Sequence, residues 1–269
     1  MQLLLFLWCA LAVLALVLTV WAVSVRIRDA SIIDIFWGFG FVVIAWVAFL
    51  FTPGSGNDRQ RLILSVTTLW GLRLTVHLGR RNIGKGEDFR YRAMRKKHGP
   101  RFPIISLRTV YLLQGALMIV VGLPVIVGSM NSAVERRWLL AVGGVVWLLG
   151  VVFETVGDLQ LTAFKRDPAN AGKVLRTGLW AWTRHPNYFG DALAWWGIWL
   201  IACTHEWGPL TILGPVAMTV LLRRVSGVPM LERTMAKRRP DYAAYVASTS
   251  AFLPRPPKRG DSSPSTARQ

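Results

Sequence analysis

Seven apolar runs constrain this chain more than any other feature, because each approaches the length that a helix needs to cross a bilayer. A helix of about 20 residues spans the hydrocarbon of a membrane. No segment competes with an alternating polar and apolar pattern, which would indicate strands. We therefore predict an all-α membrane protein with seven transmembrane helices. They cover residues 3–25, 32–51, 62–78, 110–128, 138–164, 188–203 and 210–222, and the last two are short enough to be tilted or re-entrant.

Basic residues gather on one side of these runs. The chain has 32 Lys and Arg against 14 Asp and Glu, and most of the 32 lie in 79–109, 165–184 and after 222. The opposite connections hold only Arg59, Arg61, Arg136 and Arg137. Because cytoplasmic loops carry the excess of positive charge, we predict an N-terminus outside and a C-terminus in the cytoplasm. Charge arranged in this way indicates topology rather than binding to nucleic acid.

The two ends of the chain differ in character. The first run has no basic leader and no clear cleavage site, so we interpret it as a retained span rather than a signal peptide. Residues 254–269 are rich in Pro, Ser and Arg, and we predict a disordered cytoplasmic tail after a transmembrane domain over 1–253. Both cysteines, Cys9 and Cys203, lie in apolar runs, which indicates neither a disulfide framework nor a metal cluster.

Polar residues inside the second and third runs suggest a pocket. Asp34 stands near the start of the second run, within SIIDIFWGFGF. In the third, Arg73, His77 and then Arg80 or Arg81 recur at helical spacing and share one face. For Arg73 or Asp34 taken alone, the alternative is that the two form an ion pair whose only role is to join two helices. For the whole face we favour a wet or anion-binding pocket.

The fifth run contains two carboxylates. Glu154 and Asp158 are four residues apart on one helix face, and Lys165 follows seven residues later. Two carboxylates in a medium of low dielectric constant repel each other unless one is protonated or both accept hydrogen bonds. Without a matching pair of histidines they are a weak metal signal, so we expect hydrogen bonding to a ligand and no metal.

The stretch GLWAWTRHPNYFGD precedes the sixth run. Pro186 suits the first turn of a helix, so Asn187, Tyr188 and Asp191 are expected in its opening turns and on one surface. Free backbone N–H groups at such a helix start, preceded by Arg184, can receive a phosphate. We expect His185 to cap the helix or bind phosphate rather than to act as a general base.

These motifs occur together in one known family. GLWAWTRHPNYFGD, the Glu154/Asp158/Lys165 helix, LQG, WGFGF, GEDFRYRAMR and GVPMLERTMAKRRPDYAAYVASTSAFLP resemble the bacterial DUF1295 branch of the steroid 5-alpha-reductase family. The resemblance covers nearly the whole chain, and the ordered series is its most specific part, since RHPxY also occurs in isoprenylcysteine methyltransferases. It implies a seven-span enzyme that binds NADPH from the cytosol and reduces the 4,5 C=C bond of a 3-oxo-4-ene steroid or a related apolar enone.

The resemblance also implies roles for particular residues. Asn187 and Asp191 match the stretch that meets the nicotinamide, while Glu154, Asp158 and Lys165 match the helix at the ribose and adenine phosphate, with Glu for Asn and Lys for Arg. Asp34 matches the acid that hydrogen-bonds the ketone oxygen, and a carboxyl in hydrocarbon can stay neutral and donate there. Aligning on Arg73 puts Trp70 where the family has a tyrosine, and His77 is near enough to replace that proton donor.

Further candidates follow from charge and shape. The catalytic set is Asp34, Arg73 and His77. We expect the cofactor phosphates to be bound by cations and aromatic residues, namely Arg81, Arg184, His185, Tyr188, Arg223, Arg224, Tyr242 and Tyr245. An apolar substrate would enter from the bilayer and meet Trp37, Phe41 and Trp70, although each of these aromatics also suits ordinary packing.

Two other classes of function remain open. An S-adenosylmethionine-dependent methyltransferase of the isoprenylcysteine or phospholipid type shares RHPxY and a late Arg/Glu pair, which Glu232 with Arg224 or Arg233 resembles. A lipid-binding or transport protein would also use a buried polar face. We expect a multi-pass monomer in membrane lipid, placed in the bacterial inner membrane or, in a eukaryote, the endoplasmic reticulum.

Overall fold

The computed structural model describes residues 2–133, 136–225, 228, 232 and 241–256, and within them the chain is helical with no strand. The helices fall into two compact units. Unit 1 comprises Met1–Val145 and Trp196–Ala217, and unit 2 comprises Val146–Trp195 and Met218–Gln269. The all-α prediction is confirmed. One domain over 1–253 stays a prediction, and residues 257–269 of the predicted tail lie outside the described residues.

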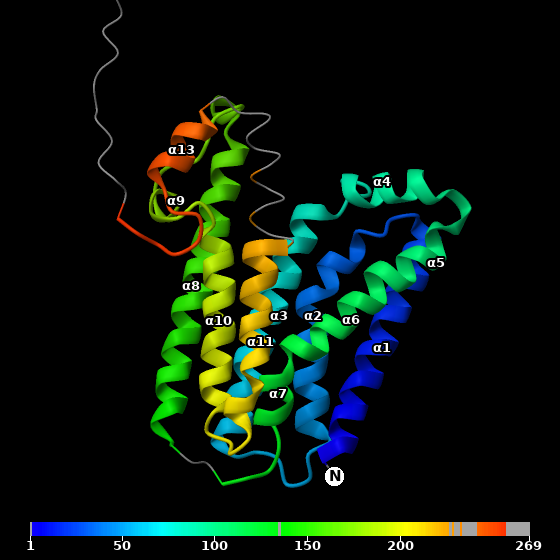
Figure 1. The fold of residues 1–269 in the computed structure, drawn as a ribbon, viewed down its shortest axis with the longest axis vertical. Coiled ribbons are helices and arrows are strands. Elements are labelled where there is room, and N and C mark those ends of the chain that lie inside the picture. Colours follow the sequence, from blue (N-terminus) through cyan, green and yellow to red (C-terminus); the bar gives the residue numbers. More distant parts are fainter. Residues whose placement is uncertain (1, 134–135, 226–227, 229–231, 233–240, 257–269) are drawn as a thin grey trace, which may run out of the picture. The chain divides into compact units, whose positions relative to one another are not determined.

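Unit 1 is built from helices of the N-terminal half of the chain. Helix α2 packs against both α1 and α3, and α1 also contacts α6 (Figure 1). The helices are α1 Gln2–Ile27, α2 Ile32–Leu50, α3 Asp58–Asn82, α4 Phe89–His98, α5 Phe102–Ser106, α6 Leu112–Val121 and α7 Leu123–Gly128. A π-helical turn, Leu107–Tyr111, joins α5 to α6.

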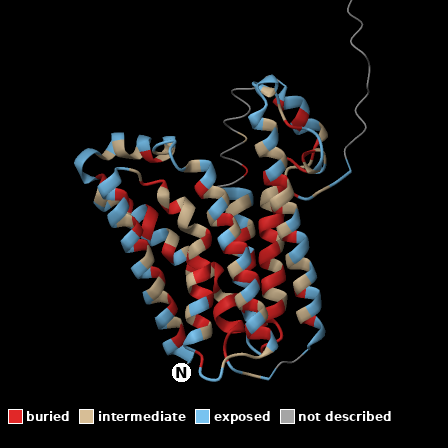
Figure 2. Ribbon diagram, turned by 180° about the vertical axis from the view of Figure 1, so that it is seen from behind, coloured by how far each residue is buried: buried red, intermediate tan, exposed pale blue. Residues whose placement is uncertain are grey.

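Helix α1 shows why these elements belong in a membrane. Its buried residues, Leu5, Cys9, Val13, Val17, Val20 and Ser24, recur every three or four positions and form one face. The rest of the helix exposes large apolar side chains such as Leu7, Leu11 and Leu14. Figure 2 colours the chain by this burial. Water would penalise so much exposed apolar surface, whereas lipid does not. The helix therefore has one face for packing and another for hydrocarbon.

The end of unit 1 that contains the α2–α3 loop is held by a buried arginine. Arg59 is fully buried and donates hydrogen bonds to backbone carbonyls, including those of Gly128 and Met130 at 2.8 Å. The next residue, Gln60, completes a capping box with Asn57 at the start of α3. A buried guanidinium is tolerated here because carbonyl oxygens satisfy its donors.

Unit 2 holds parts of three helices from the second half of the chain, together with short elements. Helices α8 Trp138–Arg166, α10 Pro186–Ala202 and α11 Leu213–Val220 have residues in both units, while α9 Leu179–Trp182 and α13 Tyr242–Ser248 belong to unit 2. A Cβ at Gly150 of α8 would lie 2.4 Å from the backbone nitrogen of Ala194 on α10. Glycine therefore lets these two helix backbones approach closely.

Six helical segments are long and apolar enough to cross a membrane. They are Gln2–Ile27, Ile32–Leu50, Asp58–Asn82, Phe89–Val121, Trp138–Arg166 and Gly208–Val225. The described residues thus support a multi-pass membrane protein, but the predicted count of seven is not reached. The predicted span 188–203 corresponds to α10, which has 17 residues because Pro186 begins it and the helix ends at Ala202.

Candidate functional site

Asp34, predicted to meet the substrate, accepts two hydrogen bonds from consecutive residues of α4. Arg90 Nη2 lies 2.7 Å from Asp34 Oδ2, and the Tyr91 hydroxyl lies 2.9 Å from Oδ1. Asp34 is in the first turn of α2, so its carboxylate is at the helix end where N–H groups favour negative charge. The site therefore joins an acid, a guanidinium and a phenol at one end of unit 1.

The α3–α4 connection orients these donors. Asp88 caps α4 by accepting a hydrogen bond from the backbone N–H of Arg90, and it also binds the Arg90 side chain at 2.8 Å. Burial would raise the pKa of Asp88, but these hydrogen bonds outweigh it and lower the pKa. Arg90 therefore bridges two carboxylates, Asp88 and Asp34, and its guanidinium is fixed between them.

Glu87 ties the same connection to the α1–α2 loop. Its carboxylate accepts two hydrogen bonds from Arg95, at 2.7 and 2.9 Å, and one from the backbone N–H of Ala30. Burial opposes ionisation, yet these bonds leave the pKa of Glu87 below its ordinary value. The GEDFRYRAMR motif is therefore a polar clamp beside Asp34.

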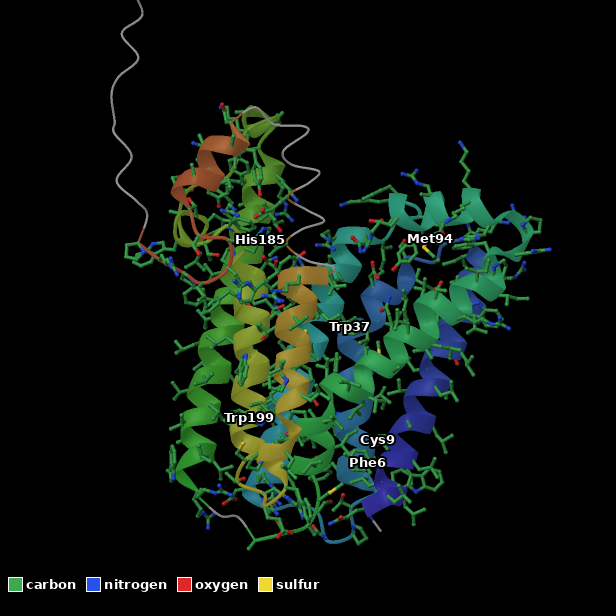
Figure 3. The ribbon with its side chains drawn as sticks, in the orientation of Figure 1. Phe6, Cys9, Trp37, Met94, His185 and Trp199 are labelled. Atoms are coloured by element: carbon green, nitrogen blue, oxygen red, sulfur yellow. The ribbon has the colours of Figure 1, made fainter. Side chains whose placement is uncertain are left out.

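The other predicted residues of unit 1 lie on α3 and α2. Arg73 and His77 are half-buried on the continuous helix α3 and share a face, as predicted, whereas Arg81 is exposed and donates to its neighbour Asn82. Trp37, labelled in Figure 3, has its ring centroid 5.5 Å from that of Phe41. The Phe41 and Trp70 centroids are 5.6 Å apart. The three predicted substrate-facing aromatics therefore form one row.

Trp70 is fully buried, and two glycines account for the tight packing around it. A Cβ at Gly38 would lie 2.5 Å from the carbonyl oxygen of Gly71 on α3. A Cβ at Gly40 would meet the sulfur of Met118 at the same distance. The WGFGF stretch of α2 therefore packs closely on two helices, on α3 at Gly38 and on α6 at Gly40.

In unit 2, α8 and α10 bring together the predicted carboxylates and amide. Glu154 and Asp158 are buried, which confirms that they are not surface residues. Asn187 Nδ2 donates to Asp158 Oδ1 at 3.0 Å, and Asp191 is also buried. Pro186 is the first residue of α10, as predicted from its fixed φ angle. The RHPNYFGD motif therefore faces α8 across the glycine-mediated crossing.

Arg184 and His185 hold a late acidic residue. Arg184 Nε lies 2.8 Å from Glu232 Oε1, and His185 Nε2 lies 3.2 Å from the same oxygen. Burial would raise the pKa of Glu232, but the hydrogen bonds from His185 and Arg184 hold it at about 2. His185, labelled in Figure 3, stacks on Tyr188 with ring centroids 5.5 Å apart.

The Arg184 guanidinium also donates to the carbonyls of Val246 and Thr249, at 3.2 and 2.5 Å. Its donors therefore hold the α13 segment, a different use from the phosphate contact predicted from the sequence. Tyr242 and Tyr245, also predicted to bind cofactor, are buried on α13, and the Tyr245 hydroxyl donates to the carbonyl of Trp180 at 2.6 Å. Burial, together with the charge of Glu232, raises the pKa of Tyr242 to about 12.

Three of the predicted cofactor cations are exposed in unit 2. They are Lys165 at the end of α8, and Arg223 and Arg224 in the π-helical turn Leu221–Val225. Neither Arg223 nor Arg224 forms an ion pair within the part of the chain that the structure describes. Their guanidinium donors are therefore available to bind a phosphate. Arg233, one of the two predicted partners of Glu232, lies outside the described residues.

The sequence analysis missed Arg90 and Tyr91 as partners of Asp34. Both are in GEDFRYRAMR, a motif that was noted but given no residue roles. A usable signal was the aromatic residue inside a basic loop, because a phenol next to arginines is well suited to bind a carboxylate. The contact of Glu232 with Arg184, which lies 48 positions earlier, was not predicted either.

Comparison with known proteins identifies a family to which the chain is similar over most of its length. A model described as "Protein of unknown function (DUF1295)" matches residues 20–249. The chain is 23% identical over 270 residues to "Uncharacterized protein C594.04c" of Schizosaccharomyces pombe, covering 87% of this chain and 75% of that protein. It is 41% identical over 49 residues to "Probable O-methyltransferase ustE" of Ustilaginoidea virens, which is 18% of this chain and 17% of that protein. No solved structure matches.

Proposed function

The chain belongs to the DUF1295 family, and from that premise we propose that it is a membrane-embedded, NADPH-dependent ene-reductase. Its substrate is a 3-oxo-4-ene steroid or a related apolar enone, reduced at the 4,5 C=C bond. The observation that carries the proposal is the Asp34 carboxyl, which binds both Tyr91 and Arg90 beside an apolar bundle. The motif resemblance to the steroid 5-alpha-reductase family supplies the reaction class.

The chemistry requires a hydrogen-bond donor at the ketone oxygen. Bound NADPH would supply a hydride to the β carbon of the enone, and the electron pair of the C=C bond then moves toward the ketone. A donor at that oxygen stabilises the developing enolate most in the transition state, and the α carbon finally takes a proton. Because both oxygens of Asp34 accept hydrogen bonds from α4, the donor in this proposal is the Tyr91 O–H, which Asp34 positions.

Trp37, the partly exposed member of the aromatic row, would contact the flat substrate, and the fully buried Phe41 and Trp70 would support it from behind. Trp37, Phe41 and Trp70 lie on α2 and α3, the helices that also carry Asp34, Arg73 and His77. An apolar enone entering from the bilayer would exchange lipid for aromatic surface without desolvating any charge. Arg73 and His77 are the further polar groups of this region for the proton transfer.

Cofactor binding is consistent with the exposed cations of unit 2. Arg223, Arg224 and Lys165 would bind the phosphates, with Tyr188 and the Asp158–Asn187 pair near the ring ends. The fit is partial at the nicotinamide end, where the Asn187 amide already donates to Asp158. In this proposal α10 is the seventh span, the N-terminus is outside and the C-terminus is cytoplasmic.

The decisive experiment measures NADPH consumption by detergent-purified protein against a panel of enones, with the product identified by mass. Tyr91→Phe should lower kcat/KM by about 10²–10³-fold, as losing a transition-state donor does, and Asp34→Asn should lower it as well. Asp58→Asn is the matched control, because Asp58 is an exposed acid that pairs with Arg137 and is not part of the site, so it should change the rate little. An unchanged rate in Asp34→Asn would remove Asp34 from this role.

A methyltransferase is the second candidate, favoured by the 49-residue similarity to a probable O-methyltransferase. It would bind S-adenosylmethionine, which has no phosphates. Calorimetry with both cofactors separates the two enzymes: uptake of NADPH alone supports the reductase, and uptake of S-adenosylmethionine alone overturns it. A protein that takes up neither cofactor would instead be a lipid-binding or transport protein.

A further inference from the structure

A cavity of about 460 Å³ lies in unit 1, away from Asp34, at the end of α1. Its volume is in the range of small-molecule sites. The lining comes from α1 and its C-terminal loop, from the end of α4 and from α5, and it comprises Ser24, Val25, Arg28, Arg95, Gly99, Pro100, Phe102, Pro103 and Ser106. The proposed reaction uses none of these residues, and only Arg95 has a role described above, as the partner of Glu87.

Two arginines supply positive charge to the cavity. Arg28 is exposed and forms no ion pair with any described residue. Arg95 is fixed by Glu87, which takes its Nε and Nη2 donors, and its guanidinium lies 4.4 Å from the centroid of the Phe102 ring. Its Nη1 makes no hydrogen bond within the described chain. The cavity therefore presents one unpaired guanidinium and one preorganised donor, a combination suited to phosphate.

The backbone at Arg28 has a conformation that favours glycine, so the presence of an arginine there is informative. Arg28 has φ +56°, in the left-handed region that favours glycine. It follows the end of α1, where the N–H of Asp29 bonds to the carbonyl of Ser24 at 3.0 Å and closes the helix. Glycine would adopt this turn without strain. An arginine is found there instead, and it lines the cavity.

The surroundings of the cavity are apolar on the side of the transmembrane helices. Val25, Ile27 and Ile104 are exposed large apolar residues in or next to the lining segments. A ligand that fits both features has an anionic head and apolar chains. Basic pockets at the ends of transmembrane helices commonly bind such lipid headgroups.

We propose that this cavity binds the phosphate of an acidic membrane phospholipid. Arg28 and Arg95 contact the phosphate, and the acyl chains lie along the exposed apolar residues of α1 and α5. The site is independent of the proposed reductase activity, because it shares no residue with it.

The test compares melting temperatures in nanodiscs of phosphatidylglycerol and of phosphatidylcholine. The wild-type protein should melt about 5 °C higher in phosphatidylglycerol. Arg28→Gln should lose most of this difference. Arg26→Gln is the matched control, since Arg26 is also exposed at the end of α1 but does not line the cavity, and it should keep the difference.

Arg28→Gly separates binding from a structural role. It should melt about 2 °C higher than wild type in phosphatidylcholine, because glycine relieves the left-handed strain, while losing the response to phosphatidylglycerol. Equal losses in Arg26→Gln and Arg28→Gln would overturn the proposal, since they indicate general surface charge. Equal stabilisation by inorganic phosphate in phosphatidylcholine nanodiscs would overturn it as well, because the site would then take the free ion.

Discussion

Two acids in this protein, Asp34 in unit 1 and Glu232 in unit 2, are each bound by two consecutive residues of a distant segment. Arg90 and Tyr91 bind Asp34, and Arg184 and His185 bind Glu232. The exposure of the arginines differs, since the side chain of Arg90 is 33% exposed and that of Arg184 is 9% exposed.

The other contacts of the two arginines differ as well. Arg90 also binds the carboxylate of Asp88, whereas Arg184 also donates to the backbone carbonyls of Val246 and Thr249. The same kind of ion pair therefore holds backbone segments together in unit 2 and leaves a one-third exposed arginine in unit 1. Four substitutions test this contrast.

The largest effect is expected from Arg184→Met. It removes a nearly buried guanidinium, leaves Glu232 without its strongest partner and frees two carbonyls, so the free energy of unfolding should fall by about 3 kcal/mol. Denaturation in detergent measures it. The exposed Arg223→Met is the control, and a similar loss in both variants would contradict a holding role for Arg184.

The next effect is the loss of stability at low pH. The pKa of Glu232 is about 2 in the folded protein against an ordinary 4.5, so its stabilisation is complete above pH 4.5 and is lost as the pH falls toward 2. The full shift corresponds to about 3 kcal/mol, and partial exposure reduces this to about 2 kcal/mol. As the pH is lowered from about 5 to about 3, the melting temperature should fall more steeply for wild type than for Glu232→Gln. Parallel curves would show that another group causes the loss.

A smaller effect is expected from Arg90→Met. Because Arg90 is one-third exposed, water replaces much of its interaction with Asp34, and the loss of stability should be about 1 kcal/mol. Arg92→Met on the exposed side of α4 serves as the reference in the same denaturation experiment. If Arg90→Met lowers the free energy of unfolding as much as Arg184→Met does, the two ion pairs do not differ in their contribution to stability.

The smallest effect is expected from Tyr188→Leu. This change removes the ring that stacks on His185, at a cost of about 0.5 kcal/mol. Tyr188→Phe keeps the ring and should match wild type in melting temperature. If Tyr188→Phe is as destabilised as Tyr188→Leu, the hydroxyl rather than the stacking is what matters.

The helices themselves were predictable from local sequence. Apolar length located α1, α2, α3 and α8 to within a few residues, and Pro186 gave the start of α10 because its φ angle and missing N–H suit only the first turn. The run 110–128 was less predictable. In the structure it is part of a longer helical path that begins at Phe89 and is interrupted near Gly122 and Pro124.

The pairing of polar groups could not be predicted in the same way. The face shared by Arg73 and His77, and the one shared by Glu154 and Asp158, follow from a period of 3.6 residues along a single helix. The bonds from Arg90 and Tyr91 to Asp34 join positions 56 and 57 apart, and no local pattern specifies such a distance.

The sequence by itself determined that this is an all-helical, multi-pass membrane protein, because apolar length and helical periodicity are local properties that hydrocarbon enforces. Only the tertiary structure decided which cation binds which carboxylate. Segments such as GEDFRYRAMR, which runs into α4, and the residues before Pro186 are placed by long-range packing, which brings their donors to acids far away in the chain. The sequence shows that an arginine is present. The fold decides whether it joins backbone segments, belongs to a candidate site or is positioned to bind lipid.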